Sequence, residues 1–319
     1  MDVNATLDQM NAVLNKCDEN SPYLPANERA YSDWREHKLE LRRRGDPVRA
    51  FRLNAEGLLP QAELRAAQRQ IEAFNFILFE ATASDFGKHE FIALNRQFGL
   101  CHLDSNPGAD DDQVTSLRVL ASTDERAQYI PYTNRAMNWH TDGYYNPPDR
   151  RVNAFALYCV QPAARGGANY LFDHEMMYLL IRDQSPEMLA ALMAEDLMRI
   201  PANVQGNRVV RAEESGPVFS LQGPGGVLNM RYTSRPRNIV WKDDQRSRQA
   251  LDRVREILME GSCLIELQLR EGQGVICNNL LHGREAFHDN PQHPARLVYR
   301  ARYYDSIDLR APCAVEARA

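Results

Sequence analysis

Apolar residues follow a helical period in the first third of the chain. Between residues 60 and 81 they recur every three or four positions, which is the spacing of one face of an α-helix. These positions are Leu64, Ala67, Ile71, Phe74 and Leu78. Pro60 suits the first position of such a helix. The pattern predicts one helix over 60–81 and a second over 88–98, which ends at Gly99.

From residue 114 onward the pattern changes to short runs rich in β-branched and aromatic residues, many of them separated by turns that contain glycine. The predicted strands cover 114–121, 152–160, 169–172, 208–211, 227–232, 263–269, 275–277 and 297–304. Two helical stretches interrupt them: 173–195, with a break at Ser185 and Pro186, and 244–260. This order predicts a mainly β fold with flanking helices, which is a β-sandwich or a jelly roll.

The start of the chain differs from the rest. Residues 1–30 are polar and predict either a loose arm or a poorly packed helical segment, and 31–49 is dense in charge. The arginine run 42–44 is either an anion-binding patch or a solvated helix end among interleaved acidic residues. We therefore predict an N-terminal arm with a charged helix, 1–46, and one jelly-roll domain with helical insertions, 47–319.

Composition and charge exclude several classes of protein. Of the 319 residues, 44% are hydrophobic and 25% are charged, which is typical of a globular protein and not of a disordered one. Lys and Arg total 38 against 43 Asp and Glu, and the net charge of −5 disfavours nucleic-acid binding. No apolar run approaches the roughly 18 residues that a membrane span needs, and we expect no signal peptide at the start.

The cysteines are scattered and include no C-x-x-C pair. They are Cys17, Cys101, Cys159, Cys263, Cys277 and Cys313. This spacing argues against a disulfide scaffold and against a thiolate zinc site, and it favours reduced thiols. We therefore predict a cytoplasmic protein whose partner is a small molecule, with neither a nucleic acid nor a membrane as a partner.

His140 and Asp142 stand two positions apart in the segment Asn-Trp-His-Thr-Asp-Gly. On a strand, side chains at i and i+2 point to the same face, so an imidazole and a carboxylate can bind one cation. His282, after the apolar run 275–277, is the best third ligand. Two histidines and one carboxylate leave positions open and suit Fe(II) that binds a co-substrate and oxygen. The pair alone is a weak signal, and its alternative is a surface pair or a capping Asp.

Arg296, Val298 and Arg300 alternate on one predicted strand, on a face that we expect to line the barrel. A guanidinium there needs a carboxylate partner. For Arg296 this is either a protein Asp or Glu or the distal carboxylate of a bound oxo acid, which its planar fork matches. Arg300 binds an anionic group of the substrate or an internal carboxylate. Tyr144 and Asn146 are candidates for the substrate pocket, and core packing is the alternative.

The pattern of His140, Asp142, His282 and, fourteen positions later, Arg296 resembles the taurine dioxygenase-like superfamily of Fe(II)/2-oxoglutarate-dependent oxygenases. The resemblance covers about 47–305. Three further segments support it, 166–167, 237–244 and 282–287. Within the superfamily the chain is most similar to the glutarate hydroxylase and γ-butyrobetaine hydroxylase branches.

The resemblance implies a double-stranded β-helix in which His140, Asp142 and His282 hold iron. It implies that Arg296 binds the distal carboxylate of 2-oxoglutarate. Asn169 stands where members of the family commonly carry Thr or Ser, and its amide N–H can still donate to a carboxylate. The implied reaction uses O2 to hydroxylate an unactivated C–H bond of a small polar molecule and releases succinate and CO2. Homo-oligomers are common in such families.

Two alternative functions stay open on the sequence. One is a non-catalytic jelly-roll protein for binding or sensing, whose structural metal a fourth protein ligand would enclose. The other is an iron oxygenase that takes electrons from its own substrate and does not need Arg296. The sequence does not identify the substrate, for which a dicarboxylate, a betaine, an amino acid, a sulfonate and a phosphonate are candidates.

Overall fold

The computed structural model describes residues 20–83, 85–104, 110, 112–205, 208–223, 225–235 and 239–313. The chain divides into two compact units. The unit that we call the helical unit contains the described residues up to Glu40 together with Phe172–Leu264. The sheet unit contains Leu41–Leu171 and the described residues from Ile265 onward. The boundary at residues 46 and 47 stays a prediction.

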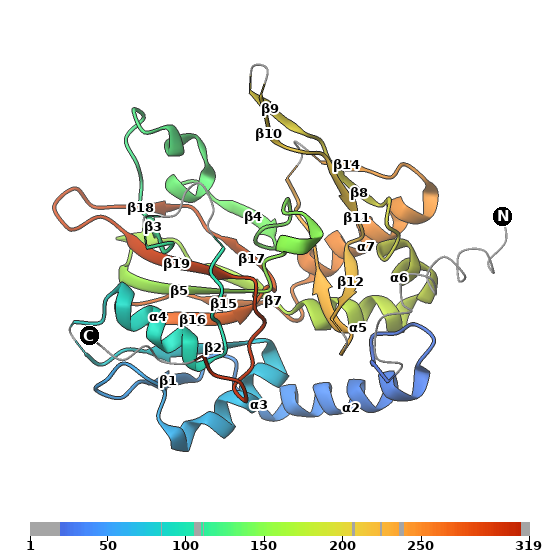
Figure 1. The fold of residues 1–319 in the computed structure, drawn as a ribbon, viewed down its shortest axis with the longest axis horizontal. Coiled ribbons are helices and arrows are strands. Elements are labelled where there is room, and N and C mark those ends of the chain that lie inside the picture. Colours follow the sequence, from blue (N-terminus) through green and yellow to red (C-terminus); the bar gives the residue numbers. More distant parts are fainter. Residues whose placement is uncertain are drawn as a thin grey trace. The chain divides into compact units, whose positions relative to one another are not determined.

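A sheet of six described strands forms the larger part of the sheet unit, in the order β1-β2-β16-β5-β19-β3 (Figure 1). The strands are β1 Ala50–Arg52, β2 Phe76–Glu80, β3 Thr115–Leu117, β5 Ala154–Gln161, β16 Gln273–Asn278 and β19 Leu297–Tyr303. The β1–β2 pair is parallel, and the other neighbours are antiparallel.

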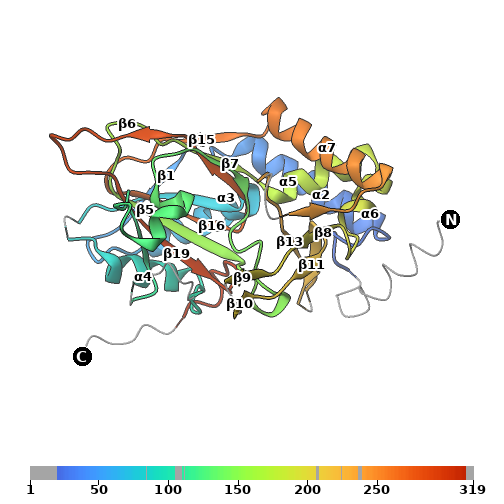
Figure 2. The same cartoon turned by 90° about the horizontal axis from the view of Figure 1, so that it is seen from above.

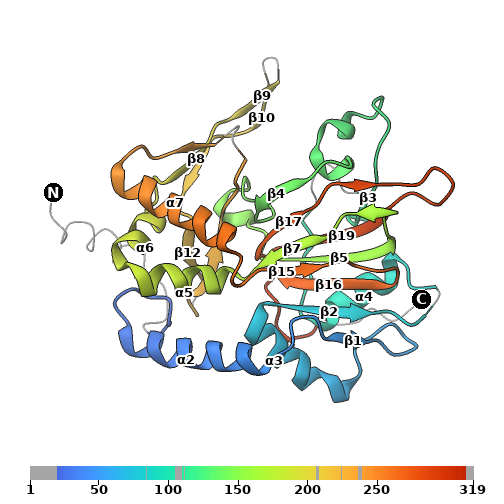
Figure 3. The same cartoon turned by 180° about the vertical axis from the view of Figure 1, so that it is seen from behind.

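A second sheet in this unit has the order β15-β7-β17-β4 (Figure 3), and Figure 2 shows β15 and β7 from above. Its strands are β4 Met137–His140, β7 Asn169–Phe172, β15 Ile265–Leu267 and β17 Leu281–Arg284, and nearby β6 Arg165–Gly166 pairs with β18 Phe287–His288. The helices of this unit are α3 Leu64–Phe74, α4 Lys88–Gln97 and the short 3-10 turns η1 Gln61–Glu63, η2 Glu125–Gln128, η3 Ile130–Tyr132 and η4 Pro148–Arg150.

The alternation of side chains along β5 explains the layers of the sheet unit. Ala154 and Ala156 belong to a hydrophobic cluster with residues of α3 and α4, so these helices cover one face of the larger sheet. Phe155 and Leu157 point the other way, into a second cluster that includes Leu171 of the smaller sheet. The two sheets therefore share one core, and both faces of β5 are buried. The mainly β fold with flanking helices is confirmed.

The segment after α3 corrects one prediction. The helix expected over 60–81 ends at Asn75, which has a left-handed backbone with φ 61°. Phe76–Glu80 is strand β2, paired on both sides within the larger sheet. Its side chains are apolar and buried on both faces except at the last position. In so short an apolar run, the spacing of hydrophobic residues does not distinguish a strand from a helix. Leu78 therefore continued the helical pattern by coincidence.

The other elements follow the sequence pattern. Each of the eight predicted strands overlaps an observed one, and the helix over 88–98 is α4. The predicted break at Ser185 separates two helices, and its hydroxyl accepts a hydrogen bond from the N–H of Met188, as an N-cap does. Several very short strands were not predicted. Arg237 of the segment 237–244 lies outside the described residues.

The helical unit contains helices α5, α6 and α7 (Figure 3), preceded along the chain by α2. The helices are α2 Glu28–Arg44, whose last turn carries the arginine run, α5 His174–Gln184, α6 Pro186–Leu192 and α7 Gln245–Glu260. The short strands are β8 Met198–Ile200, β9 Asn203–Gln205, β10 Arg208–Arg211, β11 Glu214–Gly216, β12 Phe219–Gln222, β13 Val227–Met230 and β14 Val240–Trp241. None of the described helices is long and apolar enough to cross a membrane.

A buried ion cluster ties the start of the described chain to α5. The ammonium of Lys38, which is 2% exposed, lies 2.9 Å from Asp173 Oδ2 and 2.5 Å from Glu175 Oε2. The hydroxyl of Tyr23 donates to the other oxygen of Glu175. Because buried charges are costly without partners, this cluster holds α2 and the preceding segment in place.

We expect Lys38→Ala to lower the free energy of unfolding by about 3–5 kcal/mol, because the buried carboxylate of Asp173 and the partly buried one of Glu175 lose their counter-charge. Arg35→Ala in the same helix is the matched control. Its ion pair with Asp183 is 38% and 32% exposed and is worth less than about 1 kcal/mol. Urea denaturation followed by circular dichroism measures both, and equal losses in the two variants would contradict a special role for the buried ammonium.

The cysteine prediction is wrong for one pair. Cys101 and Cys313 form a disulfide in the sheet unit, with Cα atoms 5.9 Å apart. They are 212 positions apart in the sequence, so spacing alone could not reveal the pairing. Cys159, Cys263 and Cys277 are free, as expected, and Cys17 lies outside the described residues.

Candidate metal centre

The pairing of β4 with β17 brings two histidines together. In this antiparallel pair His140 lies directly opposite His282, and the centroids of their rings are 4.2 Å apart. Asp142 follows two residues after His140, beyond the end of β4. One ligand atom from each of the three side chains lies within 4.8 Å of those of the other two. The structure therefore brings together the three residues that the sequence singled out.

Hydrogen bonds to the main chain fix the protonation of both imidazoles. His140 Nδ1 lies 2.9 Å from the carbonyl oxygen of Asn138, and His282 Nδ1 lies 3.1 Å from that of Leu280. A carbonyl only accepts, so each Nδ1 carries the proton. With the proton on Nδ1, each Nε2 can offer its lone pair to a metal.

Charge at the cluster also suits a cation. Burial would by itself raise the pKa of Asp142, but the guanidiniums of Arg300 and Arg302 hold it well below the usual range. Burial lowers the pKa of His282, so its imidazole is neutral at pH 7. Asp142 Oδ2 is buried and has no hydrogen-bond partner among the described residues. An ionised carboxylate with an orphaned oxygen, beside the imidazoles of His140 and His282, fits a divalent metal.

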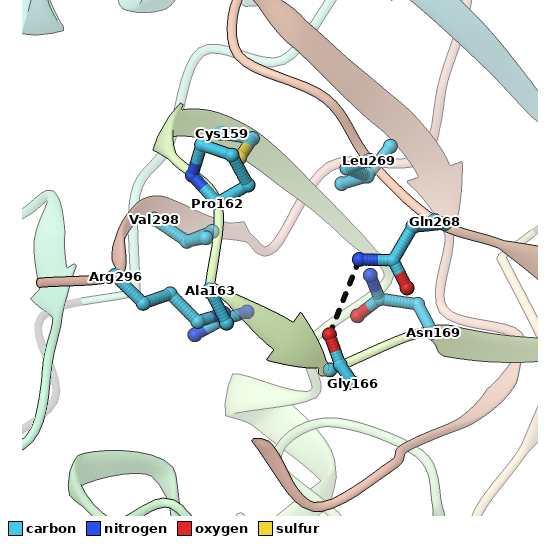
Figure 4. A pocket seen from close by; sticks show the side chains of 10 residues that line it. Cys159, Pro162, Ala163, Gly166, Asn169, Gln268, Leu269, Arg296 and Val298 are labelled. Atoms are coloured by element: carbon cyan, nitrogen blue, oxygen red, sulfur yellow. Dashed lines mark hydrogen bonds between the residues drawn. The ribbon is translucent and has the colours of Figure 1, made fainter. Parts of the chain in front are cut away.

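A small pocket lies beside Arg296 and Asn169 (Figure 4). The guanidinium of Arg296 is buried, and its Nη1 has no hydrogen-bond partner in the described structure. No ion pair joins it to a described carboxylate, although its main-chain N–H donates to Asp289. Burial lowers the pKa of Arg296, which an anion in the pocket would reverse. The buried positive charge of Arg296 therefore suits a carboxylate ligand in this pocket.

Gly166 and Gly167, which lie between Ala163 and Asn169 in the wall of this pocket, have left-handed backbones with φ 74° and 81°. A Cβ on Gly166 would lie 2.4 Å from the carbonyl oxygen of Ala286. Only glycine allows this close approach, which pairs β6 with β18 at the pocket wall.

Of the candidate substrate residues, Arg300 has a contact with the cluster that the structure describes. Arg300 is 9% exposed, with its Nη1 3.7 Å from Asp142 Oδ1 and its Nε without a partner among the described residues. The ring of Tyr144 packs edge-on against Tyr145. The side-chain amide of Asn146 donates to the carbonyl of Arg150, so it folds its own loop. Their roles toward a substrate stay predictions.

Sequence reasoning missed one charged pair close to the cluster. Arg302 is 3% exposed and forms an ion pair with the buried Asp104. Its second nitrogen donates to the hydroxyl of Tyr145 at 3.2 Å, and Tyr304 donates to Asp104. The signal was present, because Arg302 continues the alternation of Arg300 along β19. Asp104 lies 198 positions away and gave no signal.

Two histidines and one carboxylate that converge in a mainly β fold are typical of one class of protein, the non-heme Fe(II) oxygenases. The chain belongs to the TauD, TfdA family, because the model for "Taurine catabolism dioxygenase TauD, TfdA family" matches residues 44–302. It is therefore an Fe(II)- and 2-oxoglutarate-dependent dioxygenase. The predicted family is confirmed, and the branch within it stays a prediction.

Two individual proteins to which the chain is similar also carry the name of a dioxygenase. The chain is 30% identical over 235 residues to a uridine-5′-phosphate dioxygenase of a Streptomyces species, a match that covers 70% of this chain and 81% of the relative. A protein of the same name from an Amycolatopsis species is 27% identical over 180 residues, which are 54% of this chain and 63% of that relative.

Solved structures share the fold at low identity. The non-heme iron oxygenase OrfP in complex with (3S)-hydroxy-L-Arg is 16% identical with a TM-score of 0.56, covering 85% of this chain and 90% of that one. The PvcB protein of Pseudomonas aeruginosa is 19% identical with a TM-score of 0.52, covering 78% and 81%.

Proposed function

We propose that His140, Asp142 and His282 hold the iron and that Arg296 and Asn169 bind the distal carboxylate of 2-oxoglutarate. The observation that carries the proposal is the convergence of the three donor side chains on one point. The orphaned Asp142 Oδ2 supports a cation there, and the orphaned Arg296 Nη1 supports an anion in the pocket. Iron at this site, with 2-oxoglutarate and O2, supplies the oxidising chemistry, in which 2-oxoglutarate becomes succinate and CO2.

The residues of the chain do the positioning. The two imidazoles are held by their Nδ1 hydrogen bonds, which leaves one rotational setting for each ring. The planar fork of Arg296 fixes the direction of a bound carboxylate, and Asn169 adds an amide donor beside it. Phe155 covers one side of the His282 ring, with centroids 4.4 Å apart, and keeps water from it. We interpret the two sheets with their shared core as a double-stranded β-helix.

We further propose that the substrate is a small anionic molecule. Arg296, Arg300 and Arg302 stand against the carboxylates of Asp104 and Asp142. With Fe(II) and the doubly charged 2-oxoglutarate, these five side chains sum to one positive charge, and the buried Arg284 beside Arg296 adds a second. Buried charge without a partner is costly, so an anionic substrate group completes the balance. Arg300, whose Nε lacks a described partner, is the residue that we assign to it, with Tyr144 and Asn146 in the adjoining loop.

A nucleoside 5′-phosphate is the first candidate, because relatives at 30% and 27% identity are named uridine-5′-phosphate dioxygenases. Its phosphate provides the anionic group, and the reaction we propose is oxidation of an unactivated C–H bond. A cytoplasmic location and a homo-oligomer stay predictions. The Cys101–Cys313 disulfide is a pairing more typical of oxidising compartments than of the cytoplasm.

The test is a titration of the anaerobic complex with Fe(II) and 2-oxoglutarate, followed through its weak metal-to-ligand absorption band. We expect uridine 5′-phosphate to shift the band. Once O2 is admitted, succinate should form in proportion to the uridine 5′-phosphate that is consumed. Uridine, which lacks the phosphate, is the matched control and should bind at least about tenfold more weakly, since one charged hydrogen-bonded contact is missing. A band that never forms with 2-oxoglutarate would refute the proposed site.

A further inference from the structure

We infer that Asn279 is a positioning residue for the metal-binding carboxylate. The inference rests on the proposed function, in which Asp142 is an iron ligand. Asn279 Oδ1 accepts a hydrogen bond from the main-chain N–H of Asp142 at 2.8 Å, and Asn279 Nδ2 donates to the main-chain carbonyl of Asp142 at 2.8 Å. One side-chain amide thus binds both polar groups of the Asp142 main chain.

Asp142 needs these two hydrogen bonds, which we call the Asn279 clamp, because β4 ends before it. The strand stops at His140, where its pairing with β17 also stops, so Asp142 lies beyond the ladder that holds the histidines. Main-chain groups that are buried outside a ladder need other partners. Asn279 provides them from the two-residue connection between β16 and β17, three positions before His282. The carboxylate ligand is thereby tied to the segment that carries the second histidine.

The same amide closes the loop that follows the metal motif. Asn279 Nδ2 also donates to the carbonyl of Val152 at 2.7 Å, so both ends of the loop 143–151 meet one nitrogen atom. The base of this loop is narrow, because a Cβ on Gly143 would lie 2.5 Å from Val152 Cγ2. Tyr144, which we assign to the substrate pocket, lies in this loop.

The chemistry calls for asparagine. The site presents one N–H that needs an acceptor and two carbonyls that need donors, and a primary amide offers both. Aspartate has nearly the same shape but no donor, so it would place a carboxylate against two carbonyl oxygens. The main-chain N–H of Asn279 also donates to the carbonyl of Asn153 at 2.8 Å, so the clamp itself is anchored. Asn279 is 6% exposed, and water cannot replace it easily.

The neighbouring Asn278 is a matched control. Its side chain makes two hydrogen bonds, against three for Asn279. It donates to Asn75 at 2.9 Å and accepts from the N–H of Ile307 at 3.1 Å, and neither contact reaches the metal centre. A purely structural effect of losing an asparagine should therefore resemble the effect of Asn278→Ala.

The experiment measures the dissociation constant of Fe(II) alone, under anaerobic conditions, together with the melting temperature of the metal-free protein. We expect Asn279→Ala and Asn279→Asp to weaken Fe(II) binding by about 10–100-fold, the usual effect of removing a group that supports a metal ligand. The Fe(II) dissociation constant of Asn278→Ala should stay within about twofold of that of the unaltered protein, even if its melting temperature falls as far as that of Asn279→Ala. If Asn279→Ala is insoluble, the isosteric Asn279→Asp decides the question.

Asp142→Ala tests the proposed metal centre separately from the role of Asn279. If it weakens Fe(II) binding while both Asn279 variants bind Fe(II) normally, the role of Asn279 is overturned and the metal centre stands. If Asp142→Ala itself binds Fe(II) like the unaltered protein, the proposed centre fails. Equal losses of affinity in the Asn278 and Asn279 variants would also overturn the inference, because the effect would then be one of general stability.

Discussion

Replacing His282 with alanine is expected to lower the affinity for Fe(II) by at least about 100-fold and to remove succinate formation at ordinary metal concentrations. Loss of a group that merely supports a metal ligand already costs about 10–100-fold, and loss of a ligand costs more. His140 and Asp142 would remain, but two protein ligands hold Fe(II) poorly. Anaerobic Fe(II) titration with the metal-free protein measures the affinity.

His102→Ala is the control for this experiment. His102 is also a histidine of the sheet unit, but its side chain is 76% exposed and pairs with Asp305. We expect it to bind Fe(II) normally. Circular dichroism of the metal-free variants checks that the fold persists, because His282 packs against Phe155 and its removal leaves a small cavity. Normal Fe(II) binding by folded His282→Ala would show that the metal lies elsewhere.

Arg296→Ala is expected to raise the dissociation constant of 2-oxoglutarate by about 30-fold or more. Removing one partner of a buried, hydrogen-bonded charge pair costs about 2–5 kcal/mol. Arg296→Lys keeps the charge but loses the planar fork, so its dissociation constant for 2-oxoglutarate should lie between those of the unaltered protein and Arg296→Ala. Titration of the Fe(II) form with 2-oxoglutarate gives the constants, while Fe(II) affinity itself should change little.

Arg284 offers a matched control for Arg296. Both guanidiniums lie over the ring of Phe287, at 4.8 Å and 4.9 Å from its centroid, and both are buried. Arg284 donates to the carbonyls of Thr133 and Arg135 and so holds a loop. Arg284→Ala should reduce stability without a matching loss of 2-oxoglutarate affinity. Normal activity of Arg296→Ala without 2-oxoglutarate would instead indicate an oxygenase that takes electrons from its substrate.

The sequence predicted the elements whose cause is local. The helix break at Ser185 and the helix start at residue 244 were both predicted, and in the structure the side chains of Ser185 and Asp244 cap the helices that begin there. The strand Phe76–Glu80 was misread because it is buried on both faces by neighbours far away in the sequence. Its environment, which decides between strand and helix, is not encoded within its five residues.

The candidate site, too, was predicted only in part from the sequence. His140, Asp142 and His282 were chosen from residue type and spacing, since few side chains bind iron. The opposition of the two histidines across β4 and β17 needed the structure. Asn279 contacts a residue 137 positions away, and a lone asparagine carries no sequence signal of that contact. Supporting residues of this kind depend on tertiary geometry alone.

The covalent bond between Cys101 and Cys313 has a practical consequence for work with this enzyme. It encloses most of the chain, including His140 and His282, in a single macrocycle. A protease nick anywhere within that ring would leave both fragments attached, and they would separate on a gel only after a thiol reductant is added. Integrity should therefore be judged on reducing gels, and ascorbate is preferable to dithiothreitol for keeping iron ferrous while the crosslink is retained.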